Sequence, residues 1–149
     1  MARFIFVVIL FCSMTSAFSQ GKETGLTPAA PDAVLKGFIK NYGDVKVGWK
    51  EKEENYEATF KLNGMPATAW YDSTGHRMNV VVEIQTDQLP AIARSYIERN
   101  YPKAKITKAL KWTDDKKVST FQAEVKISDA SKNLLFNSRG DLIKELGGE

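Results

Sequence analysis

The sequence is almost without cysteine and histidine. Its 149 residues contain one of each, Cys12 and His76. A zinc site needs several ligands of these types, and catalysis by histidine needs a second group that orients or complements it. We therefore expect no catalytic residue, no metal site and no cofactor, and we expect that the protein is not an enzyme. His76 follows Gly75 in a turn pattern, which is typical of a solvated turn residue.

The sequence also lacks the short motifs of common catalytic and phosphate-binding sites. No G-x-S-x-G surrounds Ser73 or Ser138, and there is no phosphate loop, dinucleotide fingerprint or calcium loop. The net charge is only +3, and basic and acidic residues are interspersed. A nucleic-acid partner is therefore not expected.

A short apolar run lies at the N-terminus. Arg3 precedes the run at residues 4–12, "FIFVVILFC", and Ala17-Phe18-Ser19 follows. This layout predicts a signal peptide over residues 1–19 and a protein exported to the periplasm or the extracellular space. A membrane anchor is the alternative, but the run is too short to span a bilayer, so no stable membrane insertion is expected after cleavage. Lipidation of Cys12 is disfavoured by the bulky Phe11 before it.

A helix and four strands are expected after a flexible mature N-terminus at residues 20–27. Val34, Leu35, Phe38 and Tyr42 lie on one face of a helix that begins near Pro31. Alternating apolar and polar residues then predict strands within residues 45–50, 56–62, 67–72 and 77–85.

The same order of elements then returns. A second helix is predicted over residues 89–102, with Ile92 and Tyr96 on its inner face and Ile97 and Tyr101 near it. Four further strands are predicted within residues 104–112, 118–128, 133–138 and 142–146.

The two halves also match residue by residue. Tyr71-Asp72-Ser73-Thr74-Gly75 aligns with Phe136-Asn137-Ser138-Arg139-Gly140. The separation is 59 residues from Pro31 to Pro90, 63 from Trp49 to Trp112, and 65 from Gly75 to Gly140, so it grows only where loops are expected. The sequence therefore predicts two α-β-β-β-β units in tandem, residues 28–86 and 87–149, within one compact domain.

Each unit is too small to bury much core alone. Two separate small sheets are one possible arrangement. One continuous antiparallel sheet with both helices packed on one face buries more surface and is favoured, which makes the fold class α+β. The opposite face of the sheet would then be open to solvent or to a partner.

The repeated pattern resembles that of the PepSY-like proteins. It comprises Pro31, Phe38, Tyr42 and Tyr71-Asp72-x-x-Gly75, with Pro90, Tyr101-Pro102 and Phe136-Asn137-x-x-Gly140 in the second half. The resemblance implies a small exported protein of a kind frequent in Bacteroidetes, often described as β-lactamase-inhibitor-like because its fold is similar to that of the β-lactamase inhibitory protein. It implies no catalytic residues, and a shared shape does not give a function.

The candidate partner-binding residues lie on the expected open face. If Tyr71 packs inward, Trp70 points outward, and Thr68, Thr59 and Lys61 are expected beside it. Trp70 is either an interface anchor or a structural residue that a long basic side chain or the other repeat covers. The repeat core is expected to comprise Phe38, Tyr42, Trp49, Tyr56, Phe60, Tyr71, Gly75, Tyr101, Trp112, Phe121, Phe136 and Gly140.

These observations favour a non-enzymatic exported binding module, in one form inhibitor-like, with a protein or peptide partner on the open face. The alternatives are a small-molecule-binding protein and a purely structural component of the cell envelope.

Overall fold

The computed structural model describes residues 30–146. The predicted signal peptide at 1–19, with Cys12, and the predicted flexible segment at 20–27 lie outside the described residues. No helix within 30–146 is long and apolar enough to cross a membrane.

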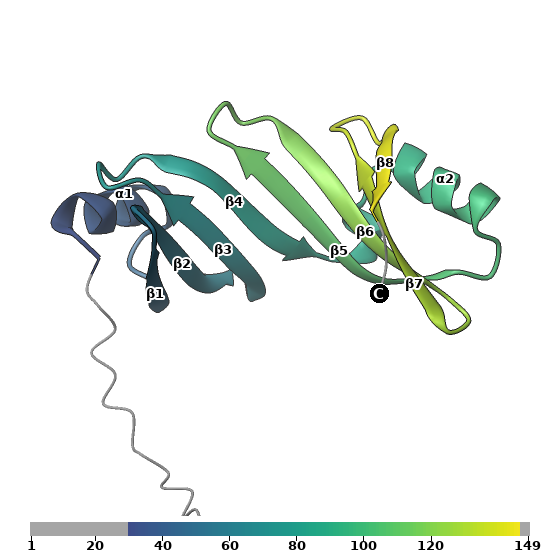
Figure 1. Ribbon diagram of the computed structural model, residues 1–149, viewed down its shortest axis with the longest axis horizontal. Helices are drawn as coiled ribbons and strands as arrows, with labels where there is room; N and C mark the ends of the chain where they lie inside the picture. The colour runs from purple at the N-terminus through teal and green to yellow at the C-terminus, as the bar shows by residue number, and fades with distance from the viewer. Residues whose placement is uncertain (1–29, 147–149) are drawn as a thin grey trace, which may run out of the picture.

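The order helix-strand-strand-strand-strand occurs twice along the chain (Figure 1). A short 3-10 helix, η1, separates the two runs. The elements are α1 (Asp32–Tyr42), β1 (Val47–Lys52), β2 (Asn55–Leu62), β3 (Met65–Tyr71), β4 (Arg77–Ile84), η1 (Thr86–Gln88), α2 (Ala91–Asn100), β5 (Lys105–Asp114), β6 (Ser119–Ile127), β7 (Ala130–Phe136) and β8 (Leu142–Leu146).

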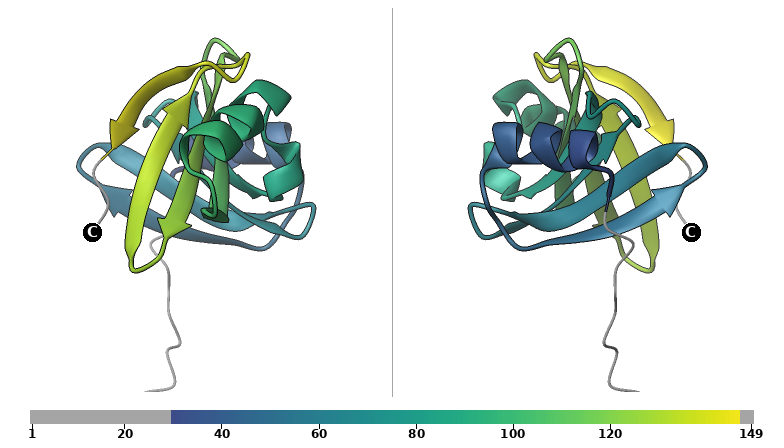
Figure 2. Two further views of the ribbon diagram at one scale, coloured as in Figure 1. Left: turned by 90° about the vertical axis from the view of Figure 1, so that its right-hand side faces the viewer. Right: turned by 90° about the vertical axis from the view of Figure 1, so that its left-hand side faces the viewer.

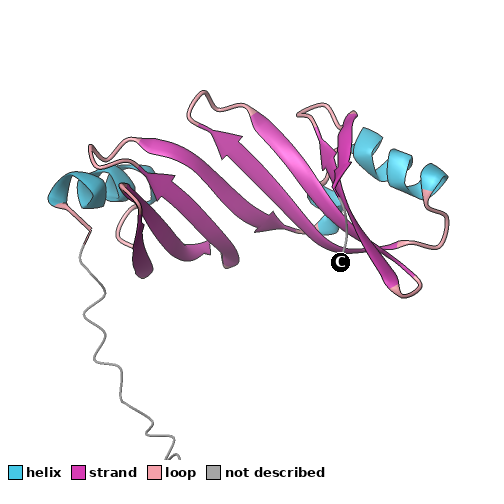
Figure 3. Ribbon diagram, viewed as in Figure 1, coloured by secondary structure: helices cyan, strands magenta, loops and turns pink. Residues whose placement is uncertain are grey.

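All eight strands belong to one antiparallel sheet in the order β1 to β8, which runs through the length of the molecule (Figure 3). The halves meet where β4 pairs with β5, from Asn79 opposite Asp114 to Ile84 opposite Ala109. The prediction of one continuous sheet is therefore confirmed, and two separate sheets are excluded.

The helices bury the narrow apolar stripe that their sequences offer. In α1, Val34 and Phe38 are buried, as predicted. In α2, Ala93 and Ile97 are the buried residues, and the prediction for Ile92 was wrong because its side chain is about half exposed. Successive helical residues are about 100° apart, so a face centred on Ala93 and Ile97 turns Ile92 toward solvent.

Aromatic rings fill the core of the first half. Phe38 lies at the centre of this cluster, with ring centroids 5.0 Å from Phe60, 5.3 Å from Tyr42, 5.4 Å from Trp49 and 6.2 Å from Tyr71. Small residues of β2 and β3, among them the buried Ala58, Ala67 and Ala69, leave room for these rings. Burying a phenylalanine such as Phe38 stabilises the fold by about 2 to 3 kcal/mol.

Aliphatic side chains dominate the core of the second half. Ala93 and Ile97 of α2 pack in one buried cluster with Val125, Leu134 and Phe136. Tyr96 and Tyr101 lie at the border of this cluster, with Tyr96 6.0 Å from Phe136 between ring centroids. In both end-on views of the molecule, α1 and α2 overlap in projection (Figure 2).

Two glycine turns hold the helices close to the sheet. Gly75 has φ +83° and Gly140 has φ +100°, a conformation that glycine adopts at low cost. A Cβ on Gly75 would also overlap the carbonyl oxygen of Ala33 in α1. A Cβ on Gly140 would lie 2.9 Å from the backbone nitrogen of Ala93 in α2. Each turn therefore needs glycine both for its conformation and for its approach to a helix.

Candidate functional site

Trp70 and Trp112 lie on the same face of the sheet, which we call the tryptophan face. Thr68 of β3 pairs with Val81 of β4, and Val81 pairs with Trp112 of β5, so these three side chains share a face. Trp70 lies two residues after Thr68 and points the same way. Tyr71, the next residue, is fully buried on the opposite face.

The two tryptophan rings stack on each other. Their centroids are 5.8 Å apart and their planes differ by 11°. The indole Nε1 of Trp70 donates a hydrogen bond of 3.2 Å to Oε2 of Glu57 on β2. Trp112 and Glu57 therefore hold Trp70 in place, and both indole rings stay partly exposed.

The position of Trp112 corrects the prediction that it belongs to the repeat core. Trp49 is opposite Ala58 in the first half, and Ala109 is opposite Ala123 in the second, so the register matches Trp49 with Ala109. The pairing of β5 with β6 shifts between Ile106 and Lys108. A one-residue shift exchanges the two faces of a strand, and it turns Trp112 away from the core.

Shallow hollows lie on both sides of Trp112. One, of about 440 Å³, extends from β4 to β8 and is lined by Asn79, Trp112, Thr113, Asp114, Val118, Thr120, Gln122, Leu135, Lys144 and Leu146. Another, of about 200 Å³, is lined by Thr59, Pro66, Ala67, Thr68, Val81, Glu83, Lys108, Leu110 and Trp112. Trp112 therefore forms a ridge between two concave areas of this face.

The four predicted partner-binding residues lie on one face of the sheet, since Lys61 follows Thr59 by two residues in an unbroken strand. Trp70, Thr68 and Thr59 belong to the tryptophan face, where Thr59 pairs with Thr68. Lys61 pairs with Pro66 and, together with Thr59, lines a further hollow of about 850 Å³ beside β1 and β2.

Sequence reasoning missed Trp112, Asn79, Asp114 and Leu135 as lining residues of the tryptophan face. Alternation along β4 and β7 could have placed Asn79 and Leu135 there. The side on which Trp112 and Asp114 lie depends on the register shift in β5, which alternation does not reveal.

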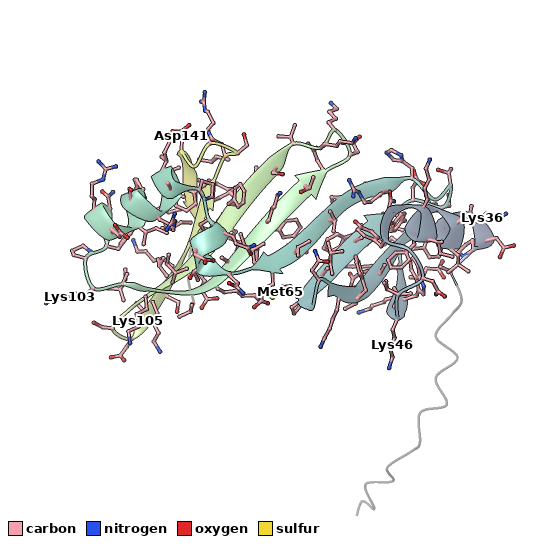
Figure 4. The ribbon with its side chains drawn as sticks, turned by 180° about the vertical axis from the view of Figure 1, so that it is seen from behind. Lys36, Lys46, Met65, Lys103, Lys105 and Asp141 are labelled. Atoms are coloured by element: carbon pink, nitrogen blue, oxygen red, sulfur yellow. The ribbon has the colours of Figure 1, made fainter. Side chains whose placement is uncertain are left out.

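Three acidic residues of the tryptophan face, Glu57, Asp114 and Glu124, form no ion pair in the described part of the chain. The three ion pairs within residues 30–146 are Lys108–Glu83, Lys132–Glu145 and Arg139–Asp141. The labelled lysines Lys36, Lys46, Lys103 and Lys105 lie at the periphery of the molecule (Figure 4).

The Tyr71–Gly75 segment is a structural turn. Oδ1 of Asp72 accepts hydrogen bonds from the backbone nitrogens of Thr74, at 2.9 Å, and His76, at 3.0 Å. Oδ1 of Asn137 likewise accepts hydrogen bonds from the backbone nitrogens of Arg139, Gly140 and Asp141. The side chain at each position shapes its turn, as turn chemistry predicts.

The shifted pKa values also have structural causes and lie away from the tryptophan face. Hydrogen bonds from Thr74 and the turn backbone lower the pKa of Asp72, and hydrogen bonds from Tyr101 and Lys132 lower the pKa of Glu145. Burial raises the pKa of Tyr71 to about 12, and the hydrogen bond to Glu145 raises that of Tyr101 to about 12. These shifts do not indicate acid-base chemistry on the tryptophan face.

No group of three or more histidine, cysteine, aspartate or glutamate side chains within residues 30–146 could hold a metal ion. The candidate site is an aromatic and polar surface around the stacked rings of Trp70 and Trp112.

The fold places the chain among α+β proteins of the BLIP-like kind, where BLIP is the β-lactamase inhibitory protein. A BLIP-like protein from Bacteroides fragilis superposes with a TM-score of 0.65 at 18% identity, over 76% of this chain and 83% of that one. No family model and no curated protein matches the sequence. The resemblance to PepSY-like proteins therefore stays a prediction.

Two further solved structures have the same fold. A DUF2874 family protein from Bacteroides uniformis has a TM-score of 0.71 at 21% identity and covers 78% of this chain and 88% of its own. A candidate periplasmic protein from Bacteroides eggerthii has a TM-score of 0.71 at 16% identity, with the same coverage. At these identities the likeness shows the fold alone.

Proposed function

We propose that this protein is a non-enzymatic exported module that binds a protein or peptide partner on its tryptophan face. The observation that carries the proposal is the partly exposed stack of Trp70 and Trp112, with a hollow on each side of Trp112. Stacked indoles are rigid, so burying them against a partner costs little conformational entropy. Occlusion of an envelope enzyme is one form that such binding would take.

The proposal places both helices on one face of the sheet and the partner on the opposite face. Val80 belongs to the first buried cluster and Ile84 packs against the second, and these residues lie four apart on β4. Residues four apart in a strand share a face, which supports placing both helices there. The repeated order of elements supports two copies of one unit, residues 28–86 and 87–149.

Export is supported by two observations. The N-terminal run at residues 4–12 has the layout of a signal peptide. One protein of the same fold is a candidate periplasmic protein. The proposed location is the periplasm or the extracellular space.

Capture of a partner from an envelope extract tests the proposal. We expect the wild-type protein to retain one stoichiometric protein, and Trp112→Ala and Trp70→Ala to lose most of it. Ile39→Ala is the matched control, because Ile39 is an exposed apolar residue of α1 and lies outside the tryptophan face. Circular dichroism checks that each variant stays folded.

Two results would contradict the proposal. Equal capture by both tryptophan variants and the wild type would remove the site from this face. Failure to retain any stoichiometric protein would instead favour a small-molecule-binding protein or a structural component of the envelope.

A further inference from the structure

The larger hollow beside Trp112 combines an apolar floor with hydrogen-bond acceptors at one end. Trp112, Val118, Leu135 and Leu146 supply apolar surface from β5, the loop after it, β7 and β8. Its volume of about 440 Å³ lies within the range of about 300 to 1,000 Å³ that ligand pockets occupy. The hollow is large enough for a long side chain.

Asn79 brings an unsatisfied acceptor to this hollow. Its Oδ1 is buried and accepts no hydrogen bond from the described residues. A buried acceptor without a donor costs about 1 to 3 kcal/mol. Because Asn79 lines the hollow, an occupant that carries N–H donors would satisfy this oxygen once the amide group turned toward it.

Asp114 adds a negative charge beside Asn79. The two residues are directly opposite in the pairing of β4 with β5. Oδ1 of Asp114 accepts a 2.7 Å hydrogen bond from the backbone nitrogen of Val118, which orients the carboxylate in its hairpin. Its other oxygen is left for an occupant, since no ion pair of residues 30–146 includes Asp114.

One cation also lines the hollow and has to be weighed against Asp114. Lys144 belongs to β8, which is three strands and about 14 Å from β5 across the sheet. The screening length at physiological ionic strength is about 8 Å, so its repulsion of a cation beside Asp114 is weak. The hairpin also carries Asp115, Lys116 and Lys117, so its four charges cancel, but of these residues only Asp114 lines the hollow. The end of the hollow beside β4 and β5 therefore favours positive charge.

We propose that this hollow binds an arginine side chain of the partner. The planar guanidinium stacks on the ring of Trp112 and donates to Asp114 and Asn79 at once, and its aliphatic stem covers Leu135. Arginine fits better than lysine because it is planar, has five N–H donors and stacks on aromatic rings. This inference rests on the proposed function, and it adds the chemistry that the partner must present.

A pair of blocked tripeptides tests the site on the purified protein. Glycyl-arginyl-glycine carries the guanidinium, and glycyl-citrullyl-glycine has nearly the same shape without the charge. NMR titration follows the indole N–H signals, with Trp49 as an internal reference because it packs against Phe38 in the core. We expect saturable shifts at Trp112, and about tenfold weaker binding of the citrulline peptide because a charge-assisted hydrogen bond is lost.

Asp114→Asn and Asp115→Asn form a matched pair of variants. Both remove one negative charge from the same hairpin, but only Asp114 lines the hollow. Asparagine at 114 keeps an oxygen that accepts the hydrogen bond from Val118. We expect Asp114→Asn to weaken binding of the arginine peptide about tenfold and Asp115→Asn to leave it unchanged.

The outcomes separate this inference from the proposed function. Equal binding of the two peptides to the wild type, equal shifts at Trp49, or equal effects of the two variants would overturn the arginine site even if a partner is captured. Binding of the arginine peptide with the expected effect of Asp114→Asn, but without capture of any protein, would keep the site and overturn the protein-binding function.

Discussion

The two halves of the sheet have the same order of elements but fill their cores differently. The helix of the first half contributes Val34 and Phe38, and the corresponding residues 59 positions later are the smaller Ala93 and Ile97. At one position of the sheet the order of size is reversed, since Ala69 of β3 corresponds to Leu134 of β7, whereas Phe60 of β2 corresponds to the smaller Val125 of β6. Leu134 fills part of the space beside the smaller residues of the second helix, and the first core remains the more aromatic of the two.

Close packing requires the helix and sheet residues of each half to fill its core together. The two halves also differ in where their tryptophan residues lie. Trp49 packs against Phe38 and Tyr71 in the first core, whereas its counterpart Ala109 needs little space. Trp112 is then free to lie on the tryptophan face.

The largest expected effect comes from emptying the two cores in turn. Phe38→Ala should lower the free energy of unfolding by about 4 kcal/mol, since it removes the ring that touches four other aromatic rings. Ile97→Ala, at the corresponding position, should cost about 3 kcal/mol. Urea unfolding monitored by circular dichroism gives both values. A larger loss for Ile97→Ala would contradict the view that the first core depends more on one side chain.

A smaller effect is expected from the turn that touches α1. Gly75→Ala forces a Cβ into a backbone with φ +83° and against the carbonyl oxygen of Ala33, and we expect a loss of about 3 kcal/mol. Gly64 also has φ +83°, but a Cβ there would meet nothing within 4 Å. Gly64→Ala should therefore cost only about 1 kcal/mol. Equal losses in thermal unfolding would show that the close approach to the helix contributes nothing.

The smallest effect at neutral pH is expected for Tyr71→Phe, which makes the first half match Phe136 of the second. It removes a 3.1 Å hydrogen bond from Nδ2 of the exposed Asn41 and should cost less than about 1 kcal/mol at pH 7.

The wild type and Tyr71→Phe should differ more clearly in stability at alkaline pH. Burial raises the pKa of Tyr71 from 10.0 to about 12, so its neutral form favours the folded state. That contribution is complete below pH 10 and is lost as the pH rises from 10 to 12. The wild type should therefore lose more stability than Tyr71→Phe in this range, and parallel curves would contradict the prediction. Tyr101 is present in both proteins, so its own titration cancels.

Much of the fold could be predicted from alternation and turn chemistry. The apolar residues of β2 and β6 alternate along the strand, and the burial argument correctly favoured one sheet over two. The position of Trp112 could not be predicted in this way, because alignment with Trp49 assumed an unbroken strand. The register shift between Ile106 and Lys108 reverses the alternation, and it depends on pairing with β6 rather than on local sequence.

Alternation predicted only the part of the candidate site that lies on an unshifted strand. Trp70 was placed correctly relative to Tyr71 because β3 alternates without interruption as far as Trp70. The residues that complete the hollow come from β4, β5 and β7, and only the tertiary register brings Asn79, Asp114 and Leu135 together.

The consecutive order of the strands leaves two free edges, β1 and β8, in the part of the chain that the structure describes. Unpaired strand edges invite aggregation through hydrogen bonds to another chain, and charged side chains oppose it. β1 exposes Lys50, Glu51 and Lys52, and β8 exposes Lys144 and Glu145 around the apolar Ile143. A sheet made only of successive hairpins is open to extension at both ends, and these charges hinder its continuation into the next molecule.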